Sequence, residues 1–191
     1  MSFTTGTQAE LLSANIAVGS ALVSSAVATS ISPTSGAAYT PSNFWLPTYG
    51  VAKSLWINAW GVLGTTGTPN LTLAVTGNIT QGTYNSSGIL ATTGVVAMPS
   101  TVTNAPWNLD VIITCSGTGA SATFLTFGTF QVYGSTTAMN AYRISSSTAN
   151  PNTAATLSTE AAYYIELAAT WGTSSASNTI TCYNYTVMGL N

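Results

Sequence analysis

The sequence predicts an all-β protein, a sandwich or barrel of about eight antiparallel strands. Three observations favour this fold class. Apolar and polar residues alternate with a period of two along most of the chain, clusters rich in Gly, Ser, Thr and Asn separate the alternating stretches, and helix signals are scarce. Many short strands joined by turns are typical of sandwiches and barrels. We expect one β domain over residues 19–191, preceded by a short N-terminal arm over residues 1–18.

The first half of the chain shows the pattern most clearly. Gln8–Ile16 is the best helix candidate, and an early strand is expected over Ala21–Ile31. Ala52–Val62 places small and aliphatic residues on one face, and two tryptophans among polar residues on the other. Gly64–Pro69 then predicts a turn, because glycine adopts positive φ readily and proline fixes the exit. The next strand, Asn70–Gly77, alternates leucine and valine with small or polar residues.

Five further strands are expected after a polar loop: Ile89–Met98, Trp107–Ser116, Ala122–Tyr133, Ala161–Trp171 and Asn178–Met188. Their boundaries follow from turn residues. Gly117–Ala120 is a tight turn, and Gly172–Ser177 is a turn of small residues. Between them, a loop rich in Ser, Thr, Asn and Ala is expected from Gly134 to about Thr159.

The chain carries almost no charge, which excludes several functions. Charged residues make up 3% of the sequence, the formal net charge is −2, and histidine is absent. Two basic residues cannot neutralise the phosphates that a nucleic-acid binder contacts. Catalysis that needs imidazole is impossible in this chain alone, and no cluster of metal ligands is visible. We therefore expect no enzymatic activity, no cofactor, no metal and no nucleic-acid partner.

The apolar content predicts a folded protein that works inside an assembly. Hydrophobic residues reach 46% and aromatics 10%, which favours a sizeable core over disorder. No run of about 20 apolar residues is present, and the start of the chain lacks an ordinary signal peptide, so we expect no membrane partner. Charge normally keeps soluble molecules apart. A chain this neutral is expected to be held by neighbours.

Two cysteines, Cys115 and Cys182, each fall inside a predicted strand. Two cysteines do not make a disulfide framework. Either they are small buried hydrophobic residues, or they form a single bridge between neighbouring strands.

The few charged residues suggest no catalytic pair. Glu160 and Glu166 are six residues apart, about 20 Å along a strand, too far for the two carboxylates of a glycosidase. Asp110 faces outward by parity and is expected to be solvated or to lie at an interface. Lys53 is interpreted as a strand-end residue that reaches solvent, and Arg143 as a loop residue that pairs with Glu160 or with a partner's acid.

Several short segments carry a family resemblance. They are Leu55-Trp56-Ile57-Asn58-Ala59-Trp60-Gly61, Thr65–Leu73, Asn104–Leu109, Gly117–Ala122 and Gly128–Phe130. In this order and spacing, over residues 43 to 133, the chain resembles jelly-roll virion structural proteins of tailed bacteriophages. The resemblance implies a jelly-roll-like β-sandwich, a homotrimer and a minor structural role: capsid decoration or cement protein, head fibre or tail fibre. It assigns no functional residue.

The resemblance sharpens one feature of the alternation. In the family pattern, the face opposite the core side of the strand at 52–62 is usually polar, whereas here it carries Trp56 and Trp60. The same parity turns Ile112, Leu125 and Phe127 outward. A sheet with apolar residues on both faces is buried on both. We predict that these five residues form a subunit interface. The alternative is that the loop at 135–159 folds over them.

We therefore expect a capsid decoration or cement protein on the outer surface of a virion. Its partners would be further copies of itself and the major capsid protein or other virion proteins. Binding to the assembled lattice and not to its separated parts would stabilise the lattice. Because charges are so few, this binding should depend little on salt.

Two alternative functions stay open. One is a tail or head fibre tip that binds a host-surface glycan or protein receptor. Trp45, Tyr49, Trp171 and Tyr183 could stack on sugars there, unless these aromatics fill the core. The other is a secreted or surface-layer adhesin of a microbe.

Overall fold

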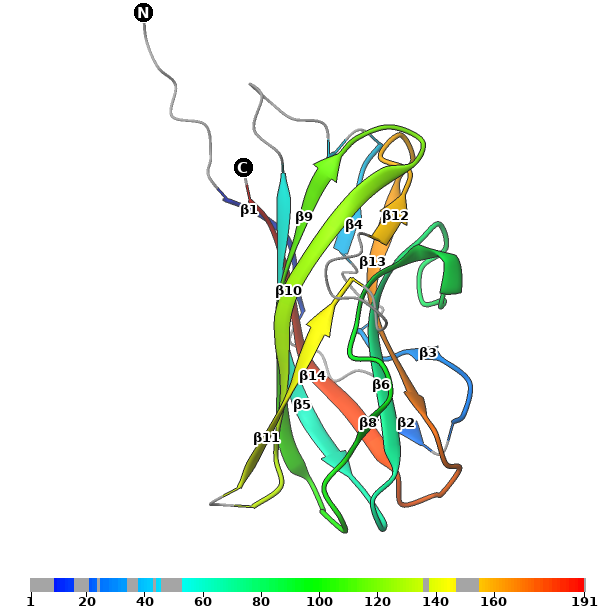
Figure 1. The fold of residues 1–191 in the computed structure, drawn as a ribbon, viewed down its shortest axis with the longest axis vertical. Coiled ribbons are helices and arrows are strands. Elements are labelled where there is room, and N and C mark those ends of the chain that lie inside the picture. The colour runs from blue at the N-terminus through cyan, green and yellow to red at the C-terminus, as the bar shows by residue number, and fades with distance from the viewer. Residues whose placement is uncertain are drawn as a thin grey trace, which may run out of the picture.

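The computed structural model is all-β and describes residues 9–15, 21–23, 25–33, 38–42, 44–45, 53–135, 138–146 and 155–190. Over these residues, fourteen strands form one antiparallel sheet (Figure 1). The strands are β1 (Ala9–Asn15), β2 (Leu22–Val23), β3 (Thr29–Ser30), β4 (Ala38–Thr40), β5 (Ser54–Gly64), β6 (Asn70–Asn78), β7 (Ile89–Thr92), β8 (Val96–Ala97), β9 (Ala105–Gly117), β10 (Ala122–Tyr133), β11 (Met139–Ser145), β12 (Ala155–Leu157), β13 (Tyr163–Trp171) and β14 (Thr179–Leu190). One 3₁₀ turn, η1, spans Ser86–Gly88. No helix in the described part of the chain has the length and apolar character to cross a membrane.

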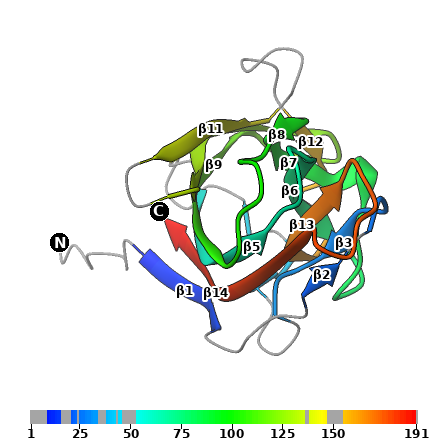
Figure 2. The ribbon, with the colours of Figure 1, turned by 90° about the horizontal axis from the view of Figure 1, so that it is seen from below.

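The sheet folds back on itself around one core. A first layer has the order β1-β14-β5-β9-β10-β11, and a second layer has the order β7-β6-β13-β3. The two layers are joined through one residue pair, Ser145 on β11 with Thr92 on β7. Seen end-on in Figure 2, the ribbon curls round the core, with β1 and β14 on one side and β13 and β3 on the other.

The core lies between the two layers and takes every second residue of the long strands of the first layer, whereas β6 and β13 of the second layer are buried along most of their length. In β5, β9 and β10, buried side chains alternate with half-buried or exposed ones, as the sequence predicts. Three tryptophans fill the centre: Trp45 and Trp171 are 0% exposed, and Trp107 is 1% exposed.

The all-β prediction is confirmed, but the expected count of about eight strands is wrong. Six predicted strands correspond to long strands, namely β5, β6, β9, β10, β13 and β14. The strand predicted over Ala21–Ile31 is instead two short strands, β2 and β3, and the stretch Ile89–Met98 holds β7 and β8. Strands of two to four residues form where a loop runs beside an existing edge. Alternation cannot reveal such short segments.

Strands occupy two segments that were expected to be something else. β1 replaces the helix predicted over Gln8–Ile16, and it pairs with β14 from Ala9 opposite Leu190 to Asn15 opposite Tyr185. β11 and β12 lie in the segment expected to be a loop from Gly134 to Thr159, and both pair with β10. In each case a neighbouring strand overrides the local signal, because sheet pairing depends on context more than on intrinsic preference.

A buried carboxylate holds two loops on the far side of the second layer. Glu166 on β13 is 1% exposed. Its Oε2 accepts hydrogen bonds from the hydroxyls of Ser30 and Ser32, each at 2.5 Å, and its Oε1 accepts one from the backbone N–H of Gly82 at 2.8 Å. Glu166 is therefore a structural anchor, whereas Glu160 is exposed.

Both cysteines are free and buried, so the alternative of a bridge is wrong. Burial raises the pKa of the Cys182 thiol from its ordinary value of 9.0 to about 12. Burial also raises the pKa of Cys115. Each thiol donates a hydrogen bond to a backbone carbonyl, Cys115 to Gly117 and Cys182 to Asn184.

Replacing Glu166→Ala should lower the free energy of unfolding by roughly 3 kcal/mol, because it removes the acceptor of three hydrogen bonds, from the hydroxyls of buried Ser32 and half-buried Ser30 and from the backbone N–H of Gly82, each worth about 1 kcal/mol. Urea unfolding followed by tryptophan fluorescence measures the loss. The matched control, Glu160→Ala, should stay within about 0.5 kcal/mol of wild type. Equal stabilities for the two variants would contradict the anchor role of Glu166.

Stability should fall as the pH rises above about 9, because unfolded Cys182 ionises near its ordinary value of 9.0 while folded Cys182 keeps its proton up to about 12. One proton of difference corresponds to about 1.4 kcal/mol per pH unit. Urea titrations at several pH values between about 8 and 11 give the slope for wild type and for Cys182→Ala. The variant should show a shallower alkaline slope, and identical slopes would show that Cys182 does not contribute.

Candidate functional site

The five residues of the predicted interface all lie on the face of the first layer that turns away from the core, here called the outer face. Trp56 and Trp60 come from β5, Ile112 from β9, and Leu125 and Phe127 from β10. Trp56 is half-buried, and the other four are 41% to 77% exposed, Phe127 most of all. Parity along the strands therefore predicted their orientation correctly.

The strand register joins three of them, together with two residues that the sequence did not single out, into one line. Residues directly opposite each other in an antiparallel pair share a face. Opposite pairs run Leu11–Met188, Met188–Trp56, Trp56–Ile112 and Ile112–Phe127. These five residues, here called the apolar row, cross five strands from β1 to β10. Leu11 at its outer end is 59% exposed.

The loop predicted as an alternative cover does not lie over this face where the structure describes it. β11 pairs with β10 from Phe127 to Tyr133, and β12 pairs with it from Ala122 to Phe124. Both segments therefore extend the sheet beside β10. Residues 136–137 and 147–154 of that loop lie outside the described residues.

A hollow adjoins the most exposed residue of the apolar row. It has a volume of about 690 Å³ and is lined by Ile112, Thr114, Leu125, Thr126, Phe127, Arg143, Ile144 and Ser145. Phe127, at 77% exposed, projects at its edge. The outer face therefore presents an apolar projection and a mostly apolar recess side by side.

A row of polar residues, here called the polar row, runs beside the apolar row on the outer face. It lies two residues away along each strand. Its members are Thr186, Asn58, Asp110, Thr129 and Arg143, which lie opposite one another in sequence across β14, β5, β9, β10 and β11. Asp110 Oδ2 accepts hydrogen bonds from Trp56 Nε1 at 3.1 Å and from Asn58 Nδ2 at 3.4 Å. Asp110 thus faces outward as predicted, and it positions the indole of Trp56. Arg143 lies on a strand and not in a loop.

Trp60 lies on the other side of the polar row, apart from the other four predicted interface residues. A β-bulge between Cys182 and Asn184 gives β14 an extra residue, Tyr183, opposite β5. The ring of Tyr183 meets that of Trp60 edge to face, with centroids 5.8 Å apart. Gly61 permits this arrangement, because a Cβ there would come within 1.9 Å of the Thr181 carbonyl oxygen.

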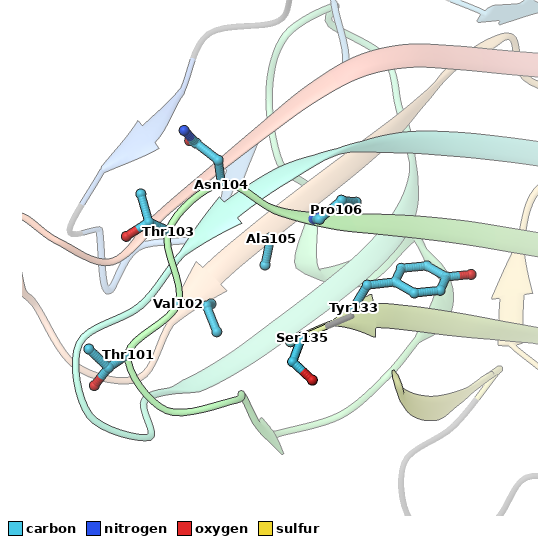
Figure 3. Close-up of a pocket in the computed structure, with 9 residues that line it drawn as sticks. Thr101, Val102, Thr103, Asn104, Ala105, Pro106, Tyr133 and Ser135 are labelled. Carbon is cyan, nitrogen blue, oxygen red and sulfur yellow. The ribbon is translucent and has the colours of Figure 1, made fainter. Parts of the chain in front are cut away.

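A second hollow opens at the rim of the sheet, where β9 begins and β10 ends (Figure 3). It has a volume of about 700 Å³ and is lined by Thr101, Val102, Thr103, Asn104, Ala105, Pro106, Tyr133, Gly134 and Ser135. Two lining residues have a left-handed backbone, Thr101 at φ 49° and Asn104 at φ 50°. For a β-branched residue such as threonine, this conformation is strained. Tyr133 has the same parity as Phe127, so alternation could have identified it.

The other aromatics considered for sugar stacking divide clearly. Trp45 and Trp171 are 0% exposed, so the suggestion that they stack on sugars is wrong for both, and they fill the core instead. Tyr183 reaches the outer face, and Tyr49 lies outside the described residues. Lys53 is half-buried, with Nζ 4.7 Å above the centre of the Phe44 ring. It is therefore held by a cation–π contact and does not simply extend into solvent.

No group of three or more His, Cys, Asp or Glu side chains that could hold a metal occurs within the described ranges. What the outer face offers is apolar area, aromatic rings and the hydrogen-bonding groups of the polar row, which include the charged Asp110 and Arg143. No family model matches the chain, and no curated protein shows significant similarity to it.

Proposed function

We propose that the protein is a structural subunit, without enzymatic activity, that associates with copies of itself through the apolar row. The observation that carries this proposal is a line of apolar side chains across five strands, with Leu11 59% and Phe127 77% exposed. Monomeric proteins rarely expose contiguous apolar surface of this kind. A sheet that is apolar on both faces is stable in water when both faces are covered.

A second copy of the chain is the occupant that fits this surface best. The net charge is −2 and only six residues are charged, so the contact must rest on shape and apolar burial. Phe127 projects beside a recess of about 690 Å³, so each copy can insert this ring into the recess of the next. A repeated contact of this type closes into a ring when the rotation between copies allows it. The homotrimer implied by the resemblance is one such ring.

The wider role that we propose is that of a capsid decoration or cement protein on the outer surface of a virion. The two-layer antiparallel arrangement is compatible with the jelly roll of the phage proteins that the chain resembles. Such a subunit would stabilise the assembled capsid lattice by mass action if it binds the lattice and not the separated capsid proteins. Electron microscopy of intact particles tests this role. Density for the trimer should appear on the capsid or tail surface, and particles without it would overturn the assignment.

A fibre tip that binds a host-surface glycan is the second candidate function. The observation that favours it is the aromatic pair of exposed Trp60 and half-buried Tyr183, which lies away from the apolar row.

Replacing Ile112→Thr or Phe127→Ser should lower the molecular mass in solution from that of a trimer to that of a monomer, because each change removes apolar area from the centre of the contact. Sedimentation equilibrium measures the mass. Ile79→Thr is the matched control, since Ile79 is 78% exposed in the loop after β6 and should not affect association. A wild-type monomer, or an unchanged mass in both row variants, would refute the proposed contact.

Association should depend only weakly on ionic strength between about 0.05 and 0.5 M, because screening acts on charges, the apolar row has none, and Arg143 is the one charged residue that lines the recess. The same sedimentation measurement at low and high salt provides the check. A marked loss of the trimer at moderate salt would indicate a charge-driven contact, with Asp110 and Arg143 of the polar row as its source.

A further inference from the structure

The outer face carries a second cluster that the proposed subunit contact does not use. It consists of Trp60, Tyr183, Pro106 and Tyr133 and is here called the aromatic strip. The polar row separates Trp60 from Trp56 of the apolar row. Trp60 is 48% exposed and Tyr133 is 42% exposed, so both rings offer surface to a ligand.

The strand register spreads the strip across four strands. Trp60 on β5 lies opposite Asn184 of β14 and Asn108 of β9, and Asn108 lies opposite Gln131 of β10. Val132 of β10 lies opposite Trp107 of β9. Because the two strands are antiparallel, Pro106, which precedes Trp107, lies beside Tyr133, which follows Val132, and both are on the outer face. Trp60 and Tyr133 are two strands and one same-face step apart, about 12 Å between Cα atoms. An extended ligand can therefore contact both rings at once.

The strip is arranged before any ligand binds. The bulge in β14 turns Tyr183 onto the outer face, and its ring meets Trp60 at an interplanar angle of 88°. The Tyr133 hydroxyl lies 3.4 Å from Gln131 Oε1, to which it donates a hydrogen bond. Rings held by neighbours lose little conformational entropy when a ligand stacks on them.

Polar groups that can bind hydroxyls lie between and beside the rings. The side chains of Asn108 and Gln131, both half-buried, occupy the middle of the strip. Asn108 Oδ1 is buried without a hydrogen-bond partner, so a side-chain movement must expose this oxygen before a ligand can reach it. The rim hollow of about 700 Å³ continues the strip past Pro106 and Tyr133, and adds Thr103, Asn104 and Ser135 to its lining (Figure 3). No charged side chain belongs to the strip or lines this hollow.

We propose that the aromatic strip and the rim hollow together bind a neutral oligosaccharide. Sugar rings present apolar C–H faces that stack on aromatic side chains, and their hydroxyls pair with amide and hydroxyl groups. Apolar platforms with a few placed polar groups and no charge fit this ligand class. A second copy of the chain is a poorer match, because the strip intersperses amides among its rings. The site stands apart from the apolar row, so it does not depend on the proposed self-association. It rests on the second candidate function, the glycan-binding fibre tip, and names its ligand class and the residues that would bind it.

Affinity electrophoresis in native gels that contain dextran, galactomannan or a soluble β-glucan tests the proposal. The wild-type chain should be retarded by at least one of these neutral polysaccharides. Trp60→Ala and Tyr133→Ala should each abolish the retardation, while Phe127→Ala, in the apolar row, should keep it. Thermal unfolding of each variant shows whether the fold is intact, and Trp60→Phe provides a milder change that keeps an aromatic ring.

Calorimetric titration with an oligosaccharide from the retarding polysaccharide then gives affinities. Trp60→Ala should weaken binding by about tenfold or more, as expected for a central aromatic contact, and Trp60→Phe should weaken it less. Migration that is unchanged in all three gels would overturn the proposal, and so would retardation that persists in both folded alanine variants. A fall in solution mass with Trp60→Ala, without retardation of the wild type, would assign the strip to the subunit contact instead.

Discussion

The pairing of β5 with β9 determines which side chains face the core and which face outward. Leu55 lies opposite Ile113 on the core side, and Trp56 lies opposite Ile112 on the outer side. A slip of one residue would exchange the two faces of a strand. In the observed register the core face is apolar, whereas the outer face mixes apolar residues with polar ones such as Asn58 and Asp110. A slipped register would turn these polar groups toward the core, so burial favours the observed one. Polar contacts between the strands also favour it, such as Ser54 Oγ with Thr114 Oγ1 at 2.9 Å and Trp56 Nε1 with Asp110 Oδ2 at 3.1 Å.

The scarcity of charge shapes the interior as well as the surface. Glu166 is held by hydroxyls and a backbone N–H rather than by a cation. In the core, the indole nitrogens of Trp45, Trp107 and Trp171 have no hydrogen-bond partner. An unmet donor costs about 1–3 kcal/mol, whereas a buried aromatic ring of about 200 Å² gains roughly 5 kcal/mol. Burial of the rings therefore outweighs the missing hydrogen bonds, and the core tolerates three tryptophans without polar partners.

The sequence was most informative where strands are long and regularly alternating. The outward orientation of Ile112, Leu125 and Phe127 follows from parity alone, because β9 and β10 keep strict alternation there. The position of Leu11 did not follow, because its segment contains good helix formers and becomes a strand only beside β14. Nor did the contact of Tyr183 with Trp60, because a bulge shifts the parity of β14 and leaves no local trace in the sequence.

The place of β14 between β1 and β5 has a consequence for the order of folding. The hairpin of β9 and β10 can close as soon as both strands have left the ribosome. The first layer cannot close at that stage, because β1 pairs with β14, from Ala9 opposite Leu190 onward. β14 is synthesised after every other described strand. Until then β1 lacks its pairing partner among the described strands and β5 keeps one open edge, and open edges invite pairing with other chains. The nascent polypeptide therefore passes through a stage at high risk of aggregation, which ends only when its final strand inserts.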